Sequence, residues 1–377
     1  MFEFLKIPAA IVFIGLVTVS AQEQTNTIHL KKVVAEFQQE NLLPGISVVI
    51  INDGRMIFKH GEGFARKGVR ANGDTVYHAA SVSKVIAGTL AVKIQQSKRL
   101  EDGTKANLIL SRPTASYLKN IRQTRGAVVS IPSKHKHTVS QLFSHLGCIK
   151  GYEGKTPVPD YYPKAIDALS KIWNEDFVSD CVLGRDWNYS THAFTYIAAV
   201  LEKVTGRTSA ELIRSEIAVP HDLRTLRASW KGVRHSRAQK LAVHYDENLR
   251  PIKLWNNSWK VFGGGLQIST ADLARFGWKV RNGEIVRPVH RDNILWKRVN
   301  PSKAFGISWR LTRRKGRSVA EHSGKWRGNR TNLRVYRGKS TPLVIAVMTN
   351  REFFKKGNLN TLSNELIDIV LRVRRLG

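Results

Sequence analysis

Short runs of β-branched residues mark the first strands that the chain predicts. The segment Gly45 to Ile51 is one such run, and the residues Asn52, Asp53 and Gly54 follow it directly. A second short run, Arg55 to Lys59, comes next. Two runs joined by Asn, Asp and Gly are typical of a β-hairpin, because these residues accept the backbone angles of a tight turn.

A longer stretch, from Ser81 to about Gln96, has the pattern of a largely buried helix. Its apolar residues Val85, Leu90 and Ile94 recur at helical spacing. The same reading predicts further helices at Thr191 to Val204 with Gly206 as its end, Thr208 to Ile217, Ser269 to Trp278 and Thr361 to Arg372, and further strands at Gly306 to Leu311, Asn332 to Tyr336 and Leu343 to Met348.

Strands near both ends of the chain, with helices between them, favour a mixed α/β (α+β) fold. We expect an antiparallel sheet assembled from the two termini and flanked by helices, with a mostly helical lobe inserted. The α/β part is predicted at about residues 27–96 and 265–375, and the helical lobe at about 97–264. Together they form one predicted domain, residues 22–377.

The first residues predict a secretion signal at residues 1–21. Met1 to Lys6 carries a single lysine and one glutamate, Ile7 to Val19 is almost wholly apolar, and the small residues Ser20 and Ala21 precede Gln22. This apolar run is shorter than the roughly 20 residues that a bilayer span needs. The sequence therefore predicts a cleaved signal and a secreted or periplasmic protein, with an uncleaved membrane anchor as the alternative.

The charge of the chain is strongly positive. Lys and Arg number 61 against 29 Asp and Glu, which gives a formal net charge of +32. The basic residues fall in many short clusters, such as Arg234 to Lys240 and Arg313 to Arg317, and no nucleic-acid-binding motif accompanies them. This scatter indicates a solvated basic surface with weak, salt-sensitive attraction to anionic polymers or membrane surfaces.

The only two cysteines are Cys148 and Cys181. In an exported chain such a pair is typically joined, so we predict a disulfide, with two separate buried thiols as the alternative. The histidines His135, His137 and His145 lack partners at metal-ligand spacing, and we interpret them as surface or local structural groups. The sequence predicts neither a metal nor a cofactor.

Candidate chemistry lies in the segment Ser81-Val82-Ser83-Lys84. A helix would place Ser81 and Lys84 on one face, where the lysine can take the proton of the serine hydroxyl. The small and aliphatic residues that follow would surround Lys84 with apolar groups, and desolvation lowers the pKa of an ammonium toward the range of a base. The alternative for this short pattern is an ordinary helix start.

Six short motifs follow one another along the chain. They are Pro44-Gly45-Ile46-Ser47-Val48, Ala80-Ser81-Val82-Ser83-Lys84, Tyr189-Ser190-Thr191, Gly264-Gly265-Leu266 with Ser269-Thr270-Ala271-Asp272-Leu273, Phe305-Gly306-Ile307-Ser308-Trp309 and His322-Ser323-Gly324. In this order they resemble the serine beta-lactamase-related family, which includes class C beta-lactamases, D-alanyl-D-alanine carboxypeptidases, D-aminopeptidases and carboxylesterases. The resemblance runs from about Leu30 to Leu371, and the chain looks most like the branch of the mitochondrial beta-lactamase-like protein and its bacterial relatives.

This resemblance implies a beta-lactamase/transpeptidase-like fold and a role for each motif. Ser81 resembles the acylated nucleophile, Lys84 the group that takes its proton, and Tyr189 the phenol that passes a proton to the leaving group. The segment around Ser323 resembles the strand that lines the site opposite the serine. The residues that the resemblance places at the substrate or the oxyanion are Thr191, His322, Ser323, Gly324 and Lys325, the last through its backbone N–H.

Departures from the family pattern narrow the expected substrate. Thr191 stands where class C beta-lactamases carry an asparagine that binds the substrate amide, and His322 stands where the third motif usually has a lysine. A neutral histidine is a poor fixed charge for a substrate carboxylate. The segment Ser144 to Cys148 also differs from the family's usual sequence around Thr-Ser-Gly, and we expect it to reshape a loop near the site.

We therefore predict an exported serine hydrolase that acts through an acyl-enzyme, most of all on small peptide or amide substrates. Esters or beta-lactams are alternative substrates within the enzyme class. The alternative from another class is a catalytically idle family member that binds anionic polymers through its basic surface.

Overall fold

The computed structural model describes residues 21–151, 160–174, 176–229, 241–253, 256–299 and 304–373. The predicted signal peptide lies outside these residues except for Ala21, and the basic cluster Arg234 to Lys240 lies outside them entirely. Ala21 begins a long helix, α1, which the sequence pattern did not predict. None of the helices in the described ranges combines the length and the apolar content that a membrane span requires.

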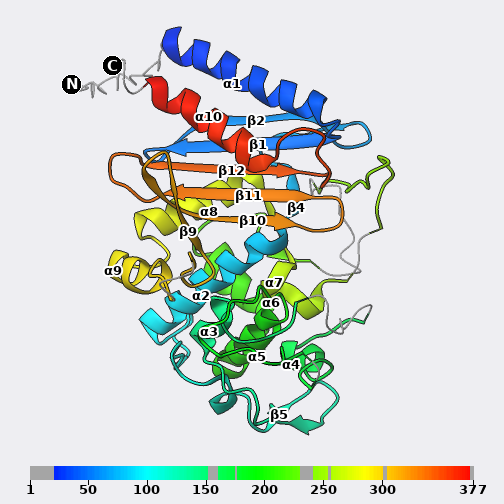
Figure 1. Cartoon of the computed structure of the whole chain (residues 1–377), viewed down its shortest axis with the longest axis vertical. Coiled ribbons are helices and arrows are strands. Elements are labelled where there is room, and N and C mark those ends of the chain that lie inside the picture. The colour runs from blue at the N-terminus through cyan, green and yellow to red at the C-terminus, as the bar shows by residue number, and fades with distance from the viewer. Residues whose placement is uncertain are drawn as a thin grey trace, which may run out of the picture.

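One antiparallel sheet built from both ends of the chain dominates the described residues (Figure 1). Its order is β3-β2-β1-β12-β11-β10-β9, and β1 near the N-terminus pairs directly with β12 near the C-terminus, with Ile46 opposite Thr349. The predicted fold class is thereby confirmed. The strands are β1 (Gly45–Asn52), β2 (Arg55–Arg66), β3 (Val69–Arg70), β9 (Arg310–Arg314), β10 (Arg317–Lys325), β11 (Arg330–Tyr336) and β12 (Leu343–Thr349).

Helices cover both faces of this sheet. The helices α1 (Ala21–Glu40) and α10 (Leu359–Val373) lie on one face, and α8 (Thr270–Asn282) packs on the other (Figure 1). Successive side chains of a strand point to opposite faces, so a strand covered on both sides must be apolar throughout. Strand β1 follows this pattern apart from Ser47, whose hydroxyl is hydrogen-bonded to Tyr77, and its last residue, Asn52. Ile46 and Val48 join the core under α1 and α10, whereas Val49 joins the core on the side of α8.

Apart from α8, most of the chain between the two groups of sheet strands forms a mainly helical lobe below the sheet in Figure 1. It begins with β4 and the helix α2, which runs from the sheet into this lobe. The remaining elements are β4 (Val76–His78), η1 (Ala80–Val82), α2 (Ser83–Ser97), η2 (Thr114–Ser116), β5 (Ile121–Arg122), β6 (Val128–Val129), α3 (Val139–Phe143), α4 (Ala165–Leu169), α5 (Ala193–Thr205), α6 (Ser209–Leu212), η3 (Ile213–Ala218), β7 (Arg227–Ala228), η4 (Ser258–Lys260), α7 (Val261–Gly264), β8 (Leu266–Ser269), α9 (Pro288–His290) and η5 (Arg291–Leu295).

The strand predicted at Gly306 to Leu311 is wrong for its first four residues, since β9 begins only at Arg310. The backbone N–H groups of Ile307 and Ser308 donate to Leu295 and Phe143, which lie outside the sheet. Ser308 also has a φ of 67°, in the left-handed region that no strand uses. These contacts hold the segment as a loop between the helical lobe and the sheet.

Candidate active site

A strained turn presents Ser81 at the junction of the sheet and the lobe. Ala80 has a φ of 47°, a conformation that an alanine adopts only where its surroundings hold it. The backbone N–H of Ala79 donates to the carbonyl oxygen of Leu266 at 2.9 Å, which fixes the chain just before the turn. Ser81 itself is partly exposed, while Val82 and Ser83 behind it are buried. The turn therefore holds the hydroxyl at the surface on a rigid support.

The ammonium group of Lys84 lies beside Ser81, as the spacing predicted. Its Nζ donates to the hydroxyl oxygens of Ser81 and Thr191, each at 3.2 Å, and to the carbonyl oxygen of Gly263. The side chain is fully buried in the first turn of α2. Burial without a carboxylate partner lowers the pKa of Lys84 to about 7. Near neutral pH a large share of Lys84 is thus an uncharged amine, which can accept a proton.

A close backbone approach at Gly263 shapes the floor of this site. A Cβ atom at Gly263 would lie 2.7 Å from the methyl group of Thr191, so only glycine fits there. Thr191, at the site of the family's asparagine, uses its hydroxyl to accept from Lys84.

The ring of Tyr189 lies close to the ammonium group of Lys84. Its ring centroid is 5.1 Å from the Nζ of Lys84, within the range of a cation–π contact. The ring packs against His145 at 4.3 Å and against His322 at 6.4 Å between centroids. The three residues that the resemblance put together, Ser81, Lys84 and Tyr189, thus gather in one place although they come from two distant parts of the chain.

The end of β10 forms the wall opposite these groups. His322 is buried, and its Nδ1 donates to the carbonyl oxygen of Ser323 at 2.8 Å, which leaves Nε2 as an acceptor in the neutral ring. Burial first, and then the charge of Lys84, lowers the pKa of His322 to about 3. Within the described residues its Nε2 is buried and has no hydrogen-bond partner. The ring therefore faces the site without charge.

The neighbours of His322 on β10 lie at different depths. Ser323 is exposed and accepts from the side-chain amide of Asn332 at 2.9 Å. Gly324 is buried, and a Cβ atom there would lie 3.0 Å from the backbone nitrogen of Ser81 and 2.7 Å from the oxygen of Ala79. The strand thus touches the turn that carries Ser81. Lys325, which ends the strand, is exposed and lies 3.7 Å from Glu352.

The prediction for the histidines is wrong where it places them at the surface. His135, His137 and His145 are all buried, each at 1% exposure or less. His145 in particular belongs to the site, because its Nδ1 accepts from the backbone N–H of Ser190 at 3.1 Å while its ring packs on Tyr189. The sequence did indicate a role for this region, because the segment Ser144 to Cys148 was expected to form an unusual loop near the site.

A second buried lysine also escaped the sequence analysis. Lys260 is 1% exposed and packs against the indole rings of Trp259 and Trp326. Burial, with further repulsion from Lys84 and Arg327, keeps the pKa of Lys260 well below its usual range. Only its position a few residues before the triple glycine could have pointed to this place.

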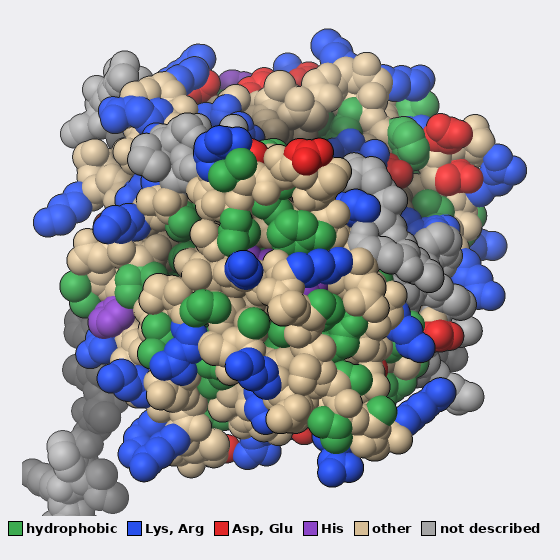
Figure 2. All heavy atoms as spheres, turned by 60° about the horizontal axis from the view of Figure 1, so that its bottom comes forward, with side chains coloured by type: hydrophobic (Ala, Val, Ile, Leu, Met, Phe, Trp, Pro, Cys, Tyr) green, Lys and Arg blue, Asp and Glu red, His purple; other side chains and the backbone are tan. Residues whose placement is uncertain are grey.

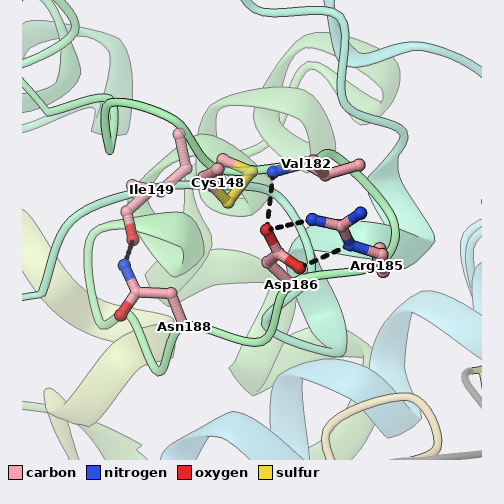
Figure 3. Close-up of a disulfide and its surroundings, with 7 residues drawn as sticks. Cys148, Ile149, Val182, Arg185, Asp186 and Asn188 are labelled. Atoms are coloured by element: carbon pink, nitrogen blue, oxygen red, sulfur yellow. Dashed lines mark hydrogen bonds and ion pairs between the residues drawn. A yellow bond between two sulfur atoms is a disulfide. The ribbon is translucent and has the colours of Figure 1, made fainter.

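The predicted disulfide is confirmed. The sulfur atoms of Cys148 and Cys181 are bonded, with their α-carbons 5.7 Å apart. The bridge joins the segment of His145 to the loop that leads to Tyr189 (Figure 3).

Comparison with known proteins places these observations in a family. The sequence profile of the Beta-lactamase family matches residues 30–366. A penicillin-binding protein of Bacillus subtilis is 24% identical over 235 residues, covering 57% of this chain and 51% of that protein. A D-aminopeptidase of Gluconobacter oxydans is 24% identical over 324 residues, covering 81% of this chain and 56% of that protein. The chain thus spans about half the length of these two relatives.

Solved structures agree on the fold. The D-amino acid amidase of Ochrobactrum anthropi SV3, complexed with L-phenylalanine, matches with a TM-score of 0.73 at 14% identity, covering 93% of this chain and 99% of that chain. The narrower resemblance to the mitochondrial branch stays a prediction. The match over residues 30–366 shows that the chain belongs to the Beta-lactamase family of serine hydrolases.

Proposed function

We propose that this protein hydrolyses small peptide or amide substrates through an acyl-enzyme on Ser81. The observation that carries the proposal is the 3.2 Å contact between Lys84 Nζ and Ser81 Oγ, made by a lysine whose pKa is lowered to about 7. A serine hydroxyl needs such an adjacent base to become a nucleophile at neutral pH. The uncharged amine takes the hydroxyl proton as Oγ bonds to the substrate carbonyl carbon.

In the next step the carbon–nitrogen bond of the tetrahedral intermediate breaks. We assign to Tyr189 the transfer of a proton to the leaving nitrogen, because its ring lies beside Lys84, which can pass the proton on. Water then attacks the acyl-enzyme, and the same two groups receive its proton and return one to Ser81 Oγ.

The negative oxygen of each intermediate needs hydrogen-bond donors. We assign this role to the backbone N–H groups of Ser81 and Lys325, since Gly324 brings the end of β10 against the backbone of Ser81. Losing one such donor costs about 3 kcal/mol of transition-state stabilisation in comparable sites.

The neutral state of His322 supports a preference for uncharged substrates at this wall of the site. A buried imidazole with a pKa lowered to about 3 offers no positive charge to a carboxylate. Amides without a nearby carboxylate therefore fit better than the carboxylate-bearing beta-lactams. The same catalytic groups would also hydrolyse small esters.

Weak binding to anionic surfaces is a second candidate function, favoured by the charge of +32. Lys and Arg side chains are scattered over the face that Figure 2 shows and do not gather in one stripe. Such a surface attracts anionic polymers at low salt. We also propose that residues 1–21 direct export of the protein, a proposal that rests on the sequence alone.

The test of the proposed hydrolysis is a substrate series. Purified protein and Ser81→Ala are offered amino acid amides, short peptides, p-nitrophenyl esters and a penicillin, and product release is measured. We expect hydrolysis of amides and esters that Ser81→Ala lacks, with slow or absent turnover of the penicillin. Equal rates for the two proteins on every substrate would overturn the proposal.

A further inference from the structure

The disulfide joins the two segments that hold Tyr189. Cys148 is buried and closely follows His145, on which the Tyr189 ring packs. Cys181 is only partly buried and opens the loop that ends at Tyr189. The bridge thus connects the support of the tyrosine ring to the loop that carries it.

Hydrogen bonds also connect the same two segments. The backbone N–H of Asn188 donates to His145 O at 2.9 Å, and that of Gly184 donates to Leu146 O at 3.0 Å. The side-chain amide of Asn188 donates to Ile149 O at 3.0 Å (Figure 3). The first two bonds reach residues just before Cys148 and the third reaches the residue just after it, so the bridge lies within the region where the two segments are bonded.

The loop is also closed on itself. The carboxylate of Asp186 accepts from the backbone N–H of Val182 at 2.9 Å and from the guanidinium of Arg185 at 2.8 Å (Figure 3). A turn braced in this way moves as a unit when its anchor at Cys181 is released, because its internal bonds do not depend on the bridge.

Two residues in the supporting segment have strained backbones. His145 has a φ of 61° and Cys148 a φ of 54°, both in the left-handed region that residues other than glycine rarely use. Such conformations persist only where neighbouring bonds hold them. One of the two is the anchor of the disulfide, so the bridge opposes relaxation of the segment under Tyr189.

We propose that the Cys148–Cys181 disulfide is a positioning element for Tyr189, so that its reduction slows hydrolysis while the protein stays folded. This inference rests on the proposed function of Tyr189. Reduction by a dithiol breaks the sulfur–sulfur bond; the reductant becomes a disulfide, and Cys148 and Cys181 take up its two electrons and two protons as thiols. Cys181, the less buried of the two residues, is the expected point of attack. Neither cysteine lies on a strand of the main sheet, which therefore keeps its pairing.

The test is a cycle between reduction and Tyr189→Phe. For the wild type, we expect reduction to lower kcat at least tenfold and to change KM by less than threefold, since displacing a catalytic group by about 1 Å costs on the order of a hundredfold. For Tyr189→Phe, already slow, reduction should lower kcat by less than twofold. Labelling of Ser81 by a fluorophosphonate should keep its rate within threefold, and reoxidation should restore kcat.

Two variants separate positioning from general stability. Cys148→Ala combined with Cys181→Ala should behave as the reduced protein does. Val34→Ala, which removes buried atoms where α1 packs on the sheet, away from the loop, should lower the unfolding temperature without lowering kcat. Circular dichroism checks that every sample is folded.

Equal loss of kcat on reduction in the wild type and in Tyr189→Phe would overturn the proposal. Hydrogen exchange supplies a readout that does not need activity: the amides of residues 182–190 should exchange faster after reduction than before it, while the exchange of the β1 amides stays unchanged. Unchanged exchange in that loop would refute the positioning role. Absence of fluorophosphonate labelling in the oxidised protein would instead refute the proposed function and leave the exchange result to decide on the bridge.

Discussion

At the scale of single residues, burial decides the chemistry of the site. Lys84, His322 and His145 all have pKa values lowered chiefly by loss of water, and none of them contacts a carboxylate in the described residues. Desolvation disfavours the charged form of each group, so Lys84 is partly an uncharged amine near neutral pH and the two imidazoles are neutral. The proposed base and the uncharged rings around it thus have the same physical cause.

The pH dependence of hydrolysis follows from Lys84. Only the uncharged amine accepts a proton, so kcat/KM should rise as the pH increases through about 7 and level off above it. Lys84→Arg should lose more than a hundredfold, because a guanidinium stays protonated in this range. A pH–rate profile on a neutral ester tests this, and a profile without an inflection near pH 7 would remove Lys84 from the role of base.

The approach of β10 to the turn of Ser81 depends on one missing side chain. In Gly324→Ala the new methyl group meets Ala79 O at 2.7 Å and Ser81 N at 3.0 Å, which forces the strand away from the turn. We expect kcat/KM to fall on the order of a hundredfold, the usual effect of losing an oxyanion donor. Gly338→Ala is the matched control, since its nearest neighbour would be 3.9 Å away. Similar activity of the two variants would contradict the assignment.

At the scale of elements, the helical lobe contains a buried chain of polar groups. His135 Nε2 donates to Trp173 O at 2.7 Å, and His137 Nε2 lies 3.3 Å from His135 Nδ1. Tyr196, from α5, donates to the carboxylate of Asp176 at 2.8 Å beside them. The neutral rings connect the segment before α3 to Trp173 and pack on the ring of Tyr196 in α5, so the lobe depends on their staying uncharged.

Acid should therefore loosen the lobe. Burial lowers the pKa of His135 to about 4 and that of His137 to about 3, so the folded state resists protons that the unfolded chain accepts near pH 6.5. Their contribution to stability is complete above about pH 6.5 and falls by up to about 1.4 kcal/mol per pH unit for each ring below it. Asp176, whose pKa burial raises to about 6, opposes part of this loss.

Urea unfolding at several pH values measures the effect. The free energy of unfolding should drop from pH 7 to pH 5, and His137→Leu should show a shallower drop. A variant whose pH dependence equals that of the wild type would show that the ring does not titrate on unfolding as described.

The elements themselves were predictable where their patterns are local. Adjacent residues determine the hairpin of β1 and β2 and the start of the helix α8. At that helix start, the side chain of Ser269 accepts a hydrogen bond from the backbone N–H of Asp272. The segment Gly306 to Trp309 reads as a strand but is held as a loop by Leu295 and Phe143, which lie far away in the sequence. Local pattern cannot report such contacts.

The candidate site also contains both residues that a local motif predicts and residues that only the fold brings there. Ser81, Lys84, Tyr189 and His322 belong to short motifs whose resemblance to a family located them. His145 and Lys260 take part because the fold brings their segments together, and burial rather than any motif gives them their properties.

At the scale of the whole molecule, the net charge of +32 acts over distances that salt controls. Screening shortens from about 10 Å at 0.1 M salt to about 3 Å at 1 M. We expect binding to heparin that is lost as salt rises, whereas hydrolysis of a neutral ester changes less than twofold. A heparin column and an ester assay over the same salt series measure both. A rate that falls together with binding would tie the surface charge to the chemistry.

The central claim is that Ser81 is the nucleophile, and intact mass after treatment with a fluorophosphonate tests it most directly. The wild type should gain the mass of one probe molecule less HF, because fluoride leaves the phosphorus and the serine hydroxyl loses its proton, and Ser81→Ala should gain nothing. A parallel sample with a penicillin shows whether that class of acyl donor is accepted. An adduct of equal yield on Ser81→Ala, or no adduct on folded wild-type protein, would contradict the account.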